Sequence, residues 1–388
     1  MTERKRQGGK VGGKAPVAKA STKASAGKSS VAKAASASAA KADLFQQLSN
    51  PPKSSDLFLW CDYVEIRCLV HPDKRFSRQN LLESLAELDA FALRDGEEEE
   101  VSDAEDDASL EEGGDGVELG DNAGEGGDPF PISDRRESKL SSIYSQLGVR
   151  AELFQQEYPF QLDDSLQEIQ LKDSFTSGGQ GLYLQLLLSA SLRLVALTRR
   201  AELTNEFENI AAEIFRGLMP LGWEVHQFGA KSAVRYKGHL FNRLSTLAAD
   251  WRGELALKKA HFKTRNSGDG GLDLVAWHPL GADGRVGVPL AAAQCGCTAE
   301  EWSLKQLEAS PSKLPIRVQH PWATYYFMPQ DLIGVIDGQY DWQRRNDLAA
   351  AIVIDRLRIV RLARQFETDT RFLTLTPAVQ EARRYQLV

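Results

Sequence analysis

The sequence has few cysteines and histidines, and neither is spaced as in a metal-binding motif. Its 388 residues contain six histidines and four cysteines, which are Cys61, Cys68, Cys295 and Cys297. Six residues separate the first cysteine pair, and the second is Cys-x-Cys within an apolar stretch. Neither spacing matches a zinc ribbon or zinc finger. We therefore expect reduced thiols, as in a cytoplasmic protein.

Long apolar segments are also missing. The sequence has no run of about 18 apolar residues, the length that a membrane span requires. No apolar core follows the basic residues Arg4, Lys5 and Arg6, as it would in a secretory signal. We therefore expect a cytoplasmic protein that makes no membrane contact.

Positive and negative charges are unevenly distributed. The net charge of −7 combines a basic segment, 1–42, with ten Lys/Arg and one Glu, and an acidic segment, 95–128, with sixteen Asp/Glu and no Lys/Arg. The basic segment has too few large apolar side chains to fold, and it is either a phosphate-gripping arm or a solubilising leader. The acidic segment either mimics nucleic-acid charge and shields a basic groove, or is a solvated insertion.

These shifts in composition divide the chain into five segments. Residues 1–42 form a disordered Lys/Ala/Ser tail, and 95–134 form an acidic disordered linker. Residues 43–94 and 135–199 are expected to be mainly helical and to pack together as one region, with Ser77 as an N-cap. Residues 200–388 follow as a separate α/β domain.

The segment from residue 200 onward alternates between helical and strand patterns. TNEFENIAAEIFRGLMPLGWEVHQFG predicts a helix, a turn at Pro220–Gly222 and a short strand, and SAVRYKGHLFNRLSTLAADW predicts a second helix. GLDLVAWHP and VGVPLAAAQCGC predict two strands joined by a turn at DGR. AEEWSLKQLEAS predicts a helix, WATYYFMP a strand and AAAIVIDRLRIVRLA a final apolar element. This alternation indicates a mixed central sheet flanked by helices.

Three oxygen-bearing side chains are expected at one end of this sheet. Asp273 precedes one strand and Gln294 lies in the next, so an antiparallel hairpin brings both to the same end. Glu208 lies on a helix with an apolar face that packs on the sheet, namely Phe207, Ile210, Ala211, Ile214 and Phe215. Two carboxylates and an amide oxygen suit Mg²⁺ or Mn²⁺. Such an ion activates water for phosphodiester hydrolysis.

Each of the three residues also has an ordinary structural interpretation. Asp273 follows glycines and suits a tight turn. Gln294 suits a buried strand as a hydrogen-bonding residue. Glu208 competes with two neighbouring glutamates of the same helix, Glu206 and Glu213. The order of the three residues along the chain favours the metal-site interpretation.

That order resembles a known nuclease family. EFENIAAEIFRGLMPLGWEV, SGDGGLDLV and AAAQCGC are similar to motifs of the Mrr-like branch of the PD-(D/E)XK nucleases, which have the restriction-endonuclease fold. In that branch a helix carries Phe-Glu and ends at a Gly-aromatic turn, as Phe207–Glu208 and Gly222–Trp223 do. A Gly-Asp-Gly-Gly-Ile-Asp motif then opens a strand, and Gly268–Asp273 is similar to it, with Asp273 rather than Asp269 as the expected ligand.

The next strand departs from the pattern that the resemblance implies. The family carries Gln-x-Lys there, and Gln294 matches the glutamine, but Gly296 stands where the lysine belongs. Glycine can neither orient a water nor supply a positive charge. Lys305, on the following predicted helix, is the expected replacement, because its long side chain can reach back to the site. The resemblance covers about residues 200–335.

The resemblance implies a metal-dependent DNA endonuclease that acts in bacterial defence against foreign or modified DNA. Its catalytic residues are then Glu208, Asp273, Gln294 and Lys305, and its metal ligands are the first three. Its partners are DNA and either a second copy of the chain or another protein of a defence system. The alternative is a catalytically inactive relative that binds DNA or docks onto a partner subunit, and a regulatory tail-and-linker protein is a third interpretation.

Overall fold

The computed structural model describes residues 43–52, 56–92, 132–173, 176–229, 235–262, 270–299 and 302–386. All of these residues belong to one compact unit within Ala42–Val388. The predicted basic tail therefore lies outside the described residues. So does most of the predicted acidic linker, because the description resumes at residue 132.

Four helices form most of the N-terminal part of the described chain. These are α1 (Leu57–Val70), α2 (Arg78–Ala92), α3 (Ile132–Phe154) and α4 (Gly178–Ala190). Ser77 caps α2 as predicted, since its Oγ accepts a hydrogen bond from the Asn80 N–H over 3.2 Å. Helix α1 packs against α3, although the acidic segment 95–128 separates the two helices in the sequence. No described helix is long and apolar enough to cross a membrane.

A small antiparallel sheet accompanies these helices. Strands β1 (Arg75–Ser77), β3 (Glu168–Leu171) and β2 (Phe160–Leu162) pair in that order. The segments 43–94 and 135–199 were predicted to be mainly helical, and the strands are an addition to that prediction. Each strand is only three or four residues long, which is too short to give a clear alternating pattern in the sequence.

The central sheet has five strands and mixed direction, as the sequence predicts. Its order is β12 (Ile352–Ile354), β9 (Ala323–Phe327), β7 (Leu290–Cys295), β6 (Leu274–Trp277) and β4 (Glu224–Gln227). The pairs β4–β6 and β6–β7 are antiparallel, whereas β7–β9 and β9–β12 are parallel. The protein is therefore mixed α/β.

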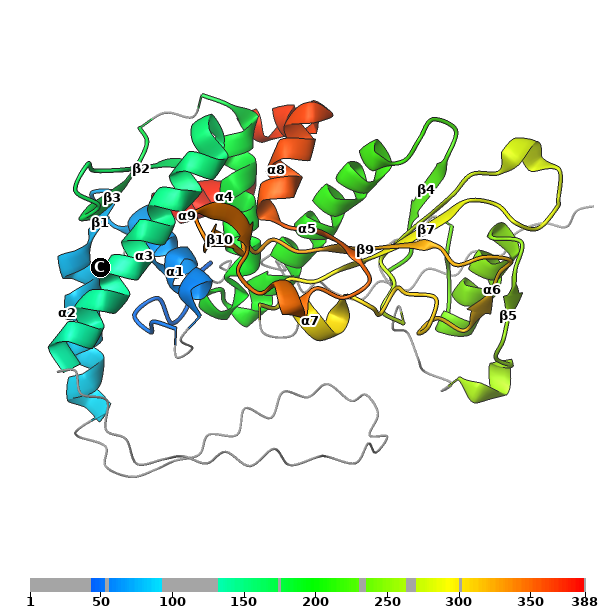
Figure 1. Cartoon of the computed structure of the whole chain (residues 1–388), viewed down its shortest axis with the longest axis horizontal. Helices are drawn as coiled ribbons and strands as arrows, with labels where there is room; N and C mark the ends of the chain where they lie inside the picture. The colour runs from blue at the N-terminus through cyan, green and yellow to red at the C-terminus, as the bar shows by residue number, and fades with distance from the viewer. Residues whose placement is uncertain are drawn as a thin grey trace, which may run out of the picture. The chain divides into compact units, whose positions relative to one another are not determined.

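Helices cover both faces of this sheet (Figure 1). Helices α5 (Leu197–Leu218) and α8 (Arg356–Gln365) pack on one face, against buried side chains of β6, β7 and β9. The predicted apolar face of α5, from Phe207 to Phe215, is buried there. Helix α6 (Leu240–Asp250) packs on the opposite face, with Trp251 and Trp277. The α5 side belongs to one hydrophobic core that runs from Leu44 to Ala382.

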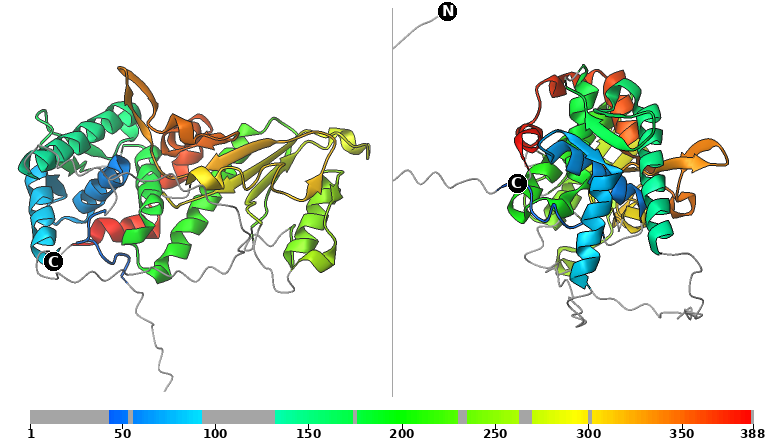
Figure 2. Two further views of the ribbon diagram at one scale, coloured as in Figure 1. Left: turned by 60° about the horizontal axis from the view of Figure 1, so that its bottom comes forward. Right: turned by 90° about the vertical axis from the view of Figure 1, so that its left-hand side faces the viewer.

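Three elements differ from the prediction for residues 200–388. Helix α7 is a single turn, Trp302–Lys305, instead of a helix over the whole stretch AEEWSLKQLEAS. The final apolar element is a strand and a helix, because the Asp355 carboxylate accepts from the Arg358 N–H and begins α8. A hairpin of β10 (Ile333–Ile336) and β11 (Gln339–Trp342) was not predicted, and it stands out from the rest of the described chain (Figure 2).

The remaining described elements are short. Strands β5 (Glu254–Leu255) and β8 (Ile316–Arg317) pair with each other, and helix α9 spans Pro377–Arg384. Single 3₁₀ turns occupy Gln155–Glu157, Leu192–Leu194, Lys259–His261, Leu280–Ala282 and Arg345–Asp347, and a longer 3₁₀ helix spans Thr368–Leu373.

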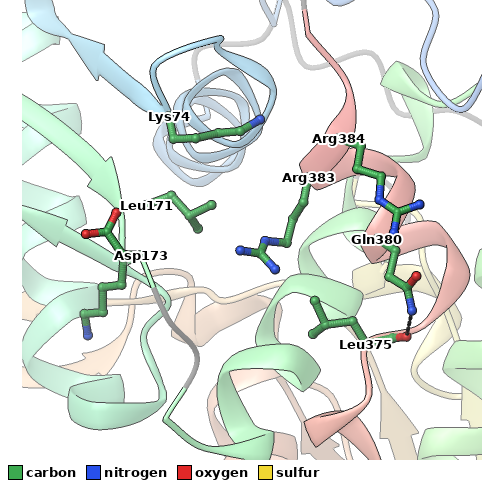
Figure 3. Close-up of a pocket in the computed structure, with 8 residues that line it drawn as sticks. Lys74, Leu171, Asp173, Leu375, Gln380, Arg383 and Arg384 are labelled. Carbon is green, nitrogen blue, oxygen red and sulfur yellow. Dashed lines mark hydrogen bonds between the residues drawn. The ribbon is translucent and has the colours of Figure 1, made fainter.

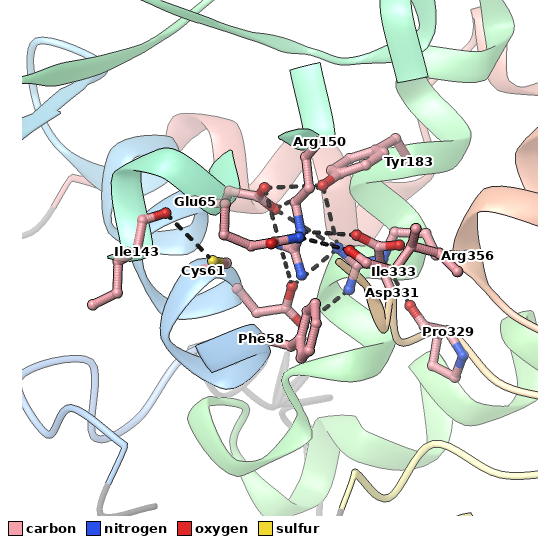
Figure 4. A network of polar contacts seen from close by, with 12 residues as sticks. Phe58, Cys61, Glu65, Ile143, Arg150, Tyr183, Pro329, Asp331, Ile333 and Arg356 are labelled. Carbon is pink, nitrogen blue, oxygen red and sulfur yellow. Dashed lines mark hydrogen bonds and ion pairs between the residues drawn. The ribbon is translucent and has the colours of Figure 1, made fainter. Parts of the chain in front are cut away.

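A buried ionic cluster joins the N-terminal helices to the loops that follow the central strands (Figure 4). Arg150 of α3 donates to Asp62 over 2.8 Å, to Glu65 over 3.0 Å and to Asp331 over 3.0 Å. Arg356 of α8 donates to both carboxylate oxygens of Asp62, over 3.0 and 2.9 Å. Because removal of one buried partner leaves an uncompensated charge, these contacts hold the two regions in one arrangement.

Burial and the arginines act in opposite directions on the carboxyl groups of this ionic cluster. Burial opposes the charged form of Asp62, but Arg356 and Arg150 hold the pKa of Asp62 below its usual value. Burial raises the pKa of Glu65 despite the same two arginines. Burial likewise raises the pKa of Asp331. The cluster therefore favours an ionised Asp62 and retains protons more readily on Glu65 and Asp331.

Candidate metal centre

Asp273 is fixed at the end of β6 by its own backbone and side chain. Its N–H donates to the Ala293 carbonyl over 3.0 Å, and its carbonyl accepts from the Phe228 N–H over 2.6 Å. Its carboxylate Oδ2 accepts from the Cys295 N–H over 2.7 Å. Only 8% of the residue is exposed. The charge is therefore held at one defined position beside β7.

Asp273 and Gln294 lie at the same end of the β6–β7 pair. Leu274 pairs with Ala293, Asp273 directly precedes Leu274, and Gln294 directly follows Ala293. Gln294 in turn pairs with Tyr326 of β9. Side chains of paired residues project from the same face of a sheet. The predicted hairpin between β6 and β7 thus brings Asp273 and Gln294 together as expected.

The Gln294 amide has an unusual environment. Gln294 is 9% exposed, and its Oε1 is buried without a hydrogen-bond partner among the described residues. A buried carbonyl oxygen without a partner costs about 1–3 kcal/mol. The oxygen is a hard donor in the strand next to Asp273, so it has the chemistry required of a metal ligand or a partner for an ordered water.

Glu208 and Asp273 line one cavity of about 130 Å³. The cavity lies between α5 and the sheet end, and its described lining comprises Asn205, Glu208, Asn209, Gln227, Gly229, Asp273 and Leu274. A liquid water takes up about 30 Å³, so the space accommodates a few waters or a hydrated ion rather than a large organic ligand. All its polar lining side chains carry oxygen acceptors.

The structure distinguishes Glu208 from the two other glutamates of its helix. Glu206 and Glu213 both accept from Arg371, over 3.1 and 2.9 Å. Glu208 faces the cavity instead. From the sequence alone, each of the three glutamates could be the one near Asp273. The pairing of Glu206 and Glu213 with Arg371 leaves Glu208 as the glutamate that lines the cavity with Asp273.

Gln294 and Lys305 are not among the described residues that line this cavity. Gln294 lies in the neighbouring strand β7, directly after Ala293, the partner of Leu274. Lys305 is half-buried at the end of α7 and acts on the Cys297 thiol, as Glu208 and Asp273 also do. The structure therefore brings Glu208 and Asp273 together at one cavity. Gln294 lies at the same end of the β6–β7 pair, and Lys305 is close enough to affect the Cys297 thiol.

The pKa of the Cys297 thiol depends on the charged side chains around it. Burial raises the pKa of its thiol, and Glu208 and Asp273 raise it further, while Lys305 lowers it. The two carboxylates outweigh the lysine at this position. Cys297 is consequently held as a neutral thiol, and it supplies no thiolate for nucleophilic chemistry.

Gly296 leaves no room for a side chain. A Cβ built on it would overlap the Tyr326 hydroxyl and lie 2.9 Å from Tyr326 Cζ. The Tyr326 ring thus fills the place from which the lysine of the Gln-x-Lys motif would project. Burial raises the pKa of the Tyr326 phenol, and the neighbouring Cys297 adds to that rise. The phenol is therefore neutral and cannot replace a lysine charge.

Sequence reasoning missed three residues near this sheet end: Tyr326, Cys297 and Glu308. Glu308 lies against Gly271, because a Cβ on Gly271 would come within 2.6 Å of Glu308 Cβ. Glu308 also acts on the Tyr326 phenol. The sequence shows that Tyr326 is in a strand, but not that a parallel partner places it beside Gln294.

A cluster of three or more His, Cys, Asp or Glu side chains placed to hold a metal does not occur among the described residues. The candidate set has two such residues and an amide. Gly268 and Asp269, the first residues of the glycine-rich motif, lie outside the described residues. No protein-family model matches the chain, and no curated protein and no solved structure is significantly similar to it.

Proposed function

We propose that this protein is a metal-dependent DNA endonuclease that hydrolyses phosphodiester bonds. The observation that carries the proposal is the shared cavity of Glu208 and Asp273 at the end of the sheet. Gln294 supports it, because its buried Oε1 has no hydrogen-bond partner among the described residues. Two carboxylates and an amide oxygen fit Mg²⁺ or Mn²⁺, which prefer hard oxygen ligands.

In this proposal Glu208, Asp273 and Gln294 hold the ion. When bound, the ion supplies activation of a water and neutralisation of charge on the phosphate. The Cys295 N–H orients the Asp273 carboxylate, so that the ligand need not be reorganised for binding. Lys305 supplies positive charge near this sheet end, and the fact that Lys305, Glu208 and Asp273 all affect the Cys297 thiol supports this role.

The order of elements supports the resemblance to the Mrr-like nucleases. Helix α5 carries Glu208, β6 follows Asp273, and the adjacent antiparallel strand β7 carries Gln294. This is the order that the resemblance implies for helix, Asp-bearing strand and Gln-bearing strand. We propose by the same resemblance a role in bacterial defence against foreign or modified DNA, with DNA and either a second copy or a defence protein as partners.

The test is a plasmid cleavage assay with Mg²⁺ or Mn²⁺ on the full chain. Asp273→Asn removes the charge but keeps an oxygen that can accept from the Cys295 N–H, so the fold should be retained. Asp283→Asn is the matched control, because Asp283 lies on an exposed loop and pairs with Arg252 and Arg285. We expect Asp273→Asn to lower cleavage at least about 100-fold and the control to cleave like the wild type.

Two results would contradict the proposal. One is equal cleavage by the wild type and Asp273→Asn. The other is no cleavage by the wild type on unmodified and modified DNA with either ion, while the protein is folded.

One observation favours a second candidate, a catalytically inactive nuclease-like protein that binds DNA or docks onto a partner subunit. Tyr326 occupies the space beside Gly296, where the motif lysine would lie. The comparison that separates the candidates is Lys305→Gln against the wild type. Loss of cleavage without loss of Mg²⁺ binding supports Lys305 as the replacement. DNA binding by a wild-type protein that cleaves nothing supports the inactive form.

A further inference from the structure

A second and larger cavity lies far along the sequence from the candidate metal centre. Its volume is about 450 Å³, within the range of small-molecule sites, about 300–1,000 Å³. It is formed between the turn before β1, the end of β3 and helix α9 (Figure 3). Its described lining is Lys74, Leu171, Lys172, Asp173, Leu375, Gln380, Arg383 and Arg384.

Positive charge dominates this lining. Lys74, Lys172, Arg383 and Arg384 are cationic, and Asp173 is the one carboxylate among the described lining residues. In Figure 3, the Lys74 and Arg383 side chains extend toward the same space from opposite sides. Asp173 is exposed, whereas Lys74, Lys172 and Arg383 are half-buried. The inner wall of the cavity is therefore more positive than its rim.

The two lysines are held in place by neutral groups. Lys74 Nζ donates to the carbonyl oxygens of Leu69, over 2.8 Å, and Tyr385, over 3.3 Å. Lys172 Nζ donates to the Tyr158 carbonyl over 2.7 Å. A carbonyl orients an ammonium group without cancelling its charge. Both ammonium groups are thus positioned in advance by contacts that do not neutralise them.

The backbone at Lys74 also points to a specific role. Its φ is 55°, in the left-handed region that non-glycine residues rarely adopt. Such conformations persist where the surrounding structure enforces them, often at ligand sites. Here this conformation accompanies a Lys74 side chain that reaches both α1 and the residue after α9.

The cationic groups interact unfavourably when no anion is present. Burial lowers the pKa of Lys74, and the neighbouring Arg383 lowers it further. Burial also lowers the pKa of Lys172, against the opposing effect of Glu157, and it lowers the pKa of Arg383. An anion in the cavity offsets the desolvation and the repulsion between Lys74 and Arg383, because it adds favourable interactions with these charges.

We propose that this cavity binds a small anion with several negative charges, of the phosphoanhydride type found in pyrophosphate, tripolyphosphate and nucleotide tails. The four cationic side chains come from three segments of the chain, and together they suit a ligand with more than one phosphate. One arginine guanidinium can donate two parallel hydrogen bonds to a phosphate. Leu171 and Leu375 are the apolar lining residues, and no aromatic side chain lines the described wall. Recognition therefore rests on phosphate rather than on stacking against a base. The proposal does not depend on the nuclease proposal.

The test is calorimetric titration of the full chain with sodium tripolyphosphate, pyrophosphate and ATP at constant ionic strength and without divalent ions. The variants are Arg383→Gln and Lys172→Gln, and the matched control is Lys313→Gln, because Lys313 is exposed and lies outside the cavity. We expect saturable binding that each cavity variant weakens at least about tenfold, through loss of a charge-assisted bond, and that the control leaves unchanged. Circular dichroism verifies that each variant is folded.

Comparison of the three titrations distinguishes an inorganic polyphosphate from a nucleotide as the ligand. Equal affinity for tripolyphosphate and ATP supports a site for phosphate alone, and tighter binding of ATP supports a nucleotide. Absence of saturable binding of all three anions overturns the proposal. So does an equal loss of affinity in Lys313→Gln and Arg383→Gln, which indicates unspecific attraction. Binding of a DNA duplex that Arg383→Gln weakens, without binding of any small anion, replaces the proposal with a nucleic-acid contact.

Discussion

The Tyr326 ring lies where a side chain on Gly296 would begin. Gly296 directly follows β7, Tyr326 lies in the neighbouring parallel strand β9, and a Cβ on Gly296 would meet Tyr326 Cζ at 2.9 Å in addition to the hydroxyl. Position 296 is therefore closed to every residue except glycine while Tyr326 keeps its place. The missing motif lysine and the buried tyrosine are one structural feature.

We expect Gly296→Ala to lower the free energy of unfolding by about 1–3 kcal/mol, the usual cost of overpacking. Tyr326→Phe should relieve part of this cost, because it removes the hydroxyl but leaves the ring carbon. Denaturant unfolding of both single variants and the double variant measures the coupling. The control is Gly148→Ala in α3, where a Cβ meets only Leu166 at an ordinary 3.7 Å. If Gly296→Ala leaves the free energy of unfolding unchanged, the prediction is wrong, and the strands can move apart to accept the methyl group.

The Gln294 amide gives a test that separates packing from ligand binding. In EDTA, Gln294→Met should leave the protein as stable as the wild type or more so, because it removes a buried oxygen without a partner. The variant should also lose any rise in Tm that Mg²⁺ gives the wild type.

Gln306→Met is the contrasting control for that experiment. Gln306 is fully buried, its Nε2 donates to the Asp347 carbonyl over 2.7 Å, and its Oε1 accepts from the Ala349 N–H over 3.0 Å. Its replacement should cost about 1–3 kcal/mol. If Gln294→Met destabilises the protein as much as Gln306→Met in EDTA, Gln294 is a structural residue rather than a metal ligand.

The buried ionic cluster predicts a large loss of stability for one arginine. Arg150→Met leaves Asp62, Glu65 and Asp331 short of a partner, and we expect a loss of about 3–5 kcal/mol. Arg75→Met removes a surface pair with Glu168, and it should cost less than about 1 kcal/mol. Urea unfolding of both variants measures the difference, and equal losses would show that the cluster adds nothing beyond a surface pair.

The buried Asp355 carboxyl should make the free energy of unfolding depend on pH. Burial raises the pKa of its carboxyl to about 7, and Asp331 adds to that rise. Between the unfolded value of about 4 and 7, the folded protein binds more protons than the unfolded chain, so this contribution to stability falls as pH rises. Asp355→Asn keeps an acceptor for the Arg358 N–H. We expect the variant to be more stable than the wild type at pH 8, with the difference shrinking toward pH 4 in thermal unfolding.

Much of the fold around the site follows from local patterns. The apolar face of α5 and the strands β6 and β7 were predicted because their side-chain periods are visible within short windows. The β10–β11 hairpin also had a local signal, since Asp337–Gly338 is a turn dipeptide with φ of 51° and 74° between alternating residues. The boundary between β12 and α8 also had a local signal, because Asp355 is a typical residue to cap the start of a helix.

The rest of the site depends on contacts that no short window contains. Glu208 was distinguished from Glu206 and Glu213 only by Arg371, which lies far along the chain. Tyr326 meets Gly296 through a parallel register, which turn chemistry does not set. Helix α7 is one turn long although its sequence has helical spacing, and propensity alone does not set where such a helix ends.

The core that runs from Leu44 to Ala382 has a consequence for synthesis on the ribosome. The Phe45 ring packs edge-on against Tyr385, with ring centroids 5.4 Å apart, although most of the chain separates the two residues. The bridge from Phe45 to Val195 can form once the middle of the chain has been synthesised, but the packing of Phe45 is complete only after Tyr385 has followed. Part of the apolar surface of this core therefore stays open to other contacts until α9 has been made.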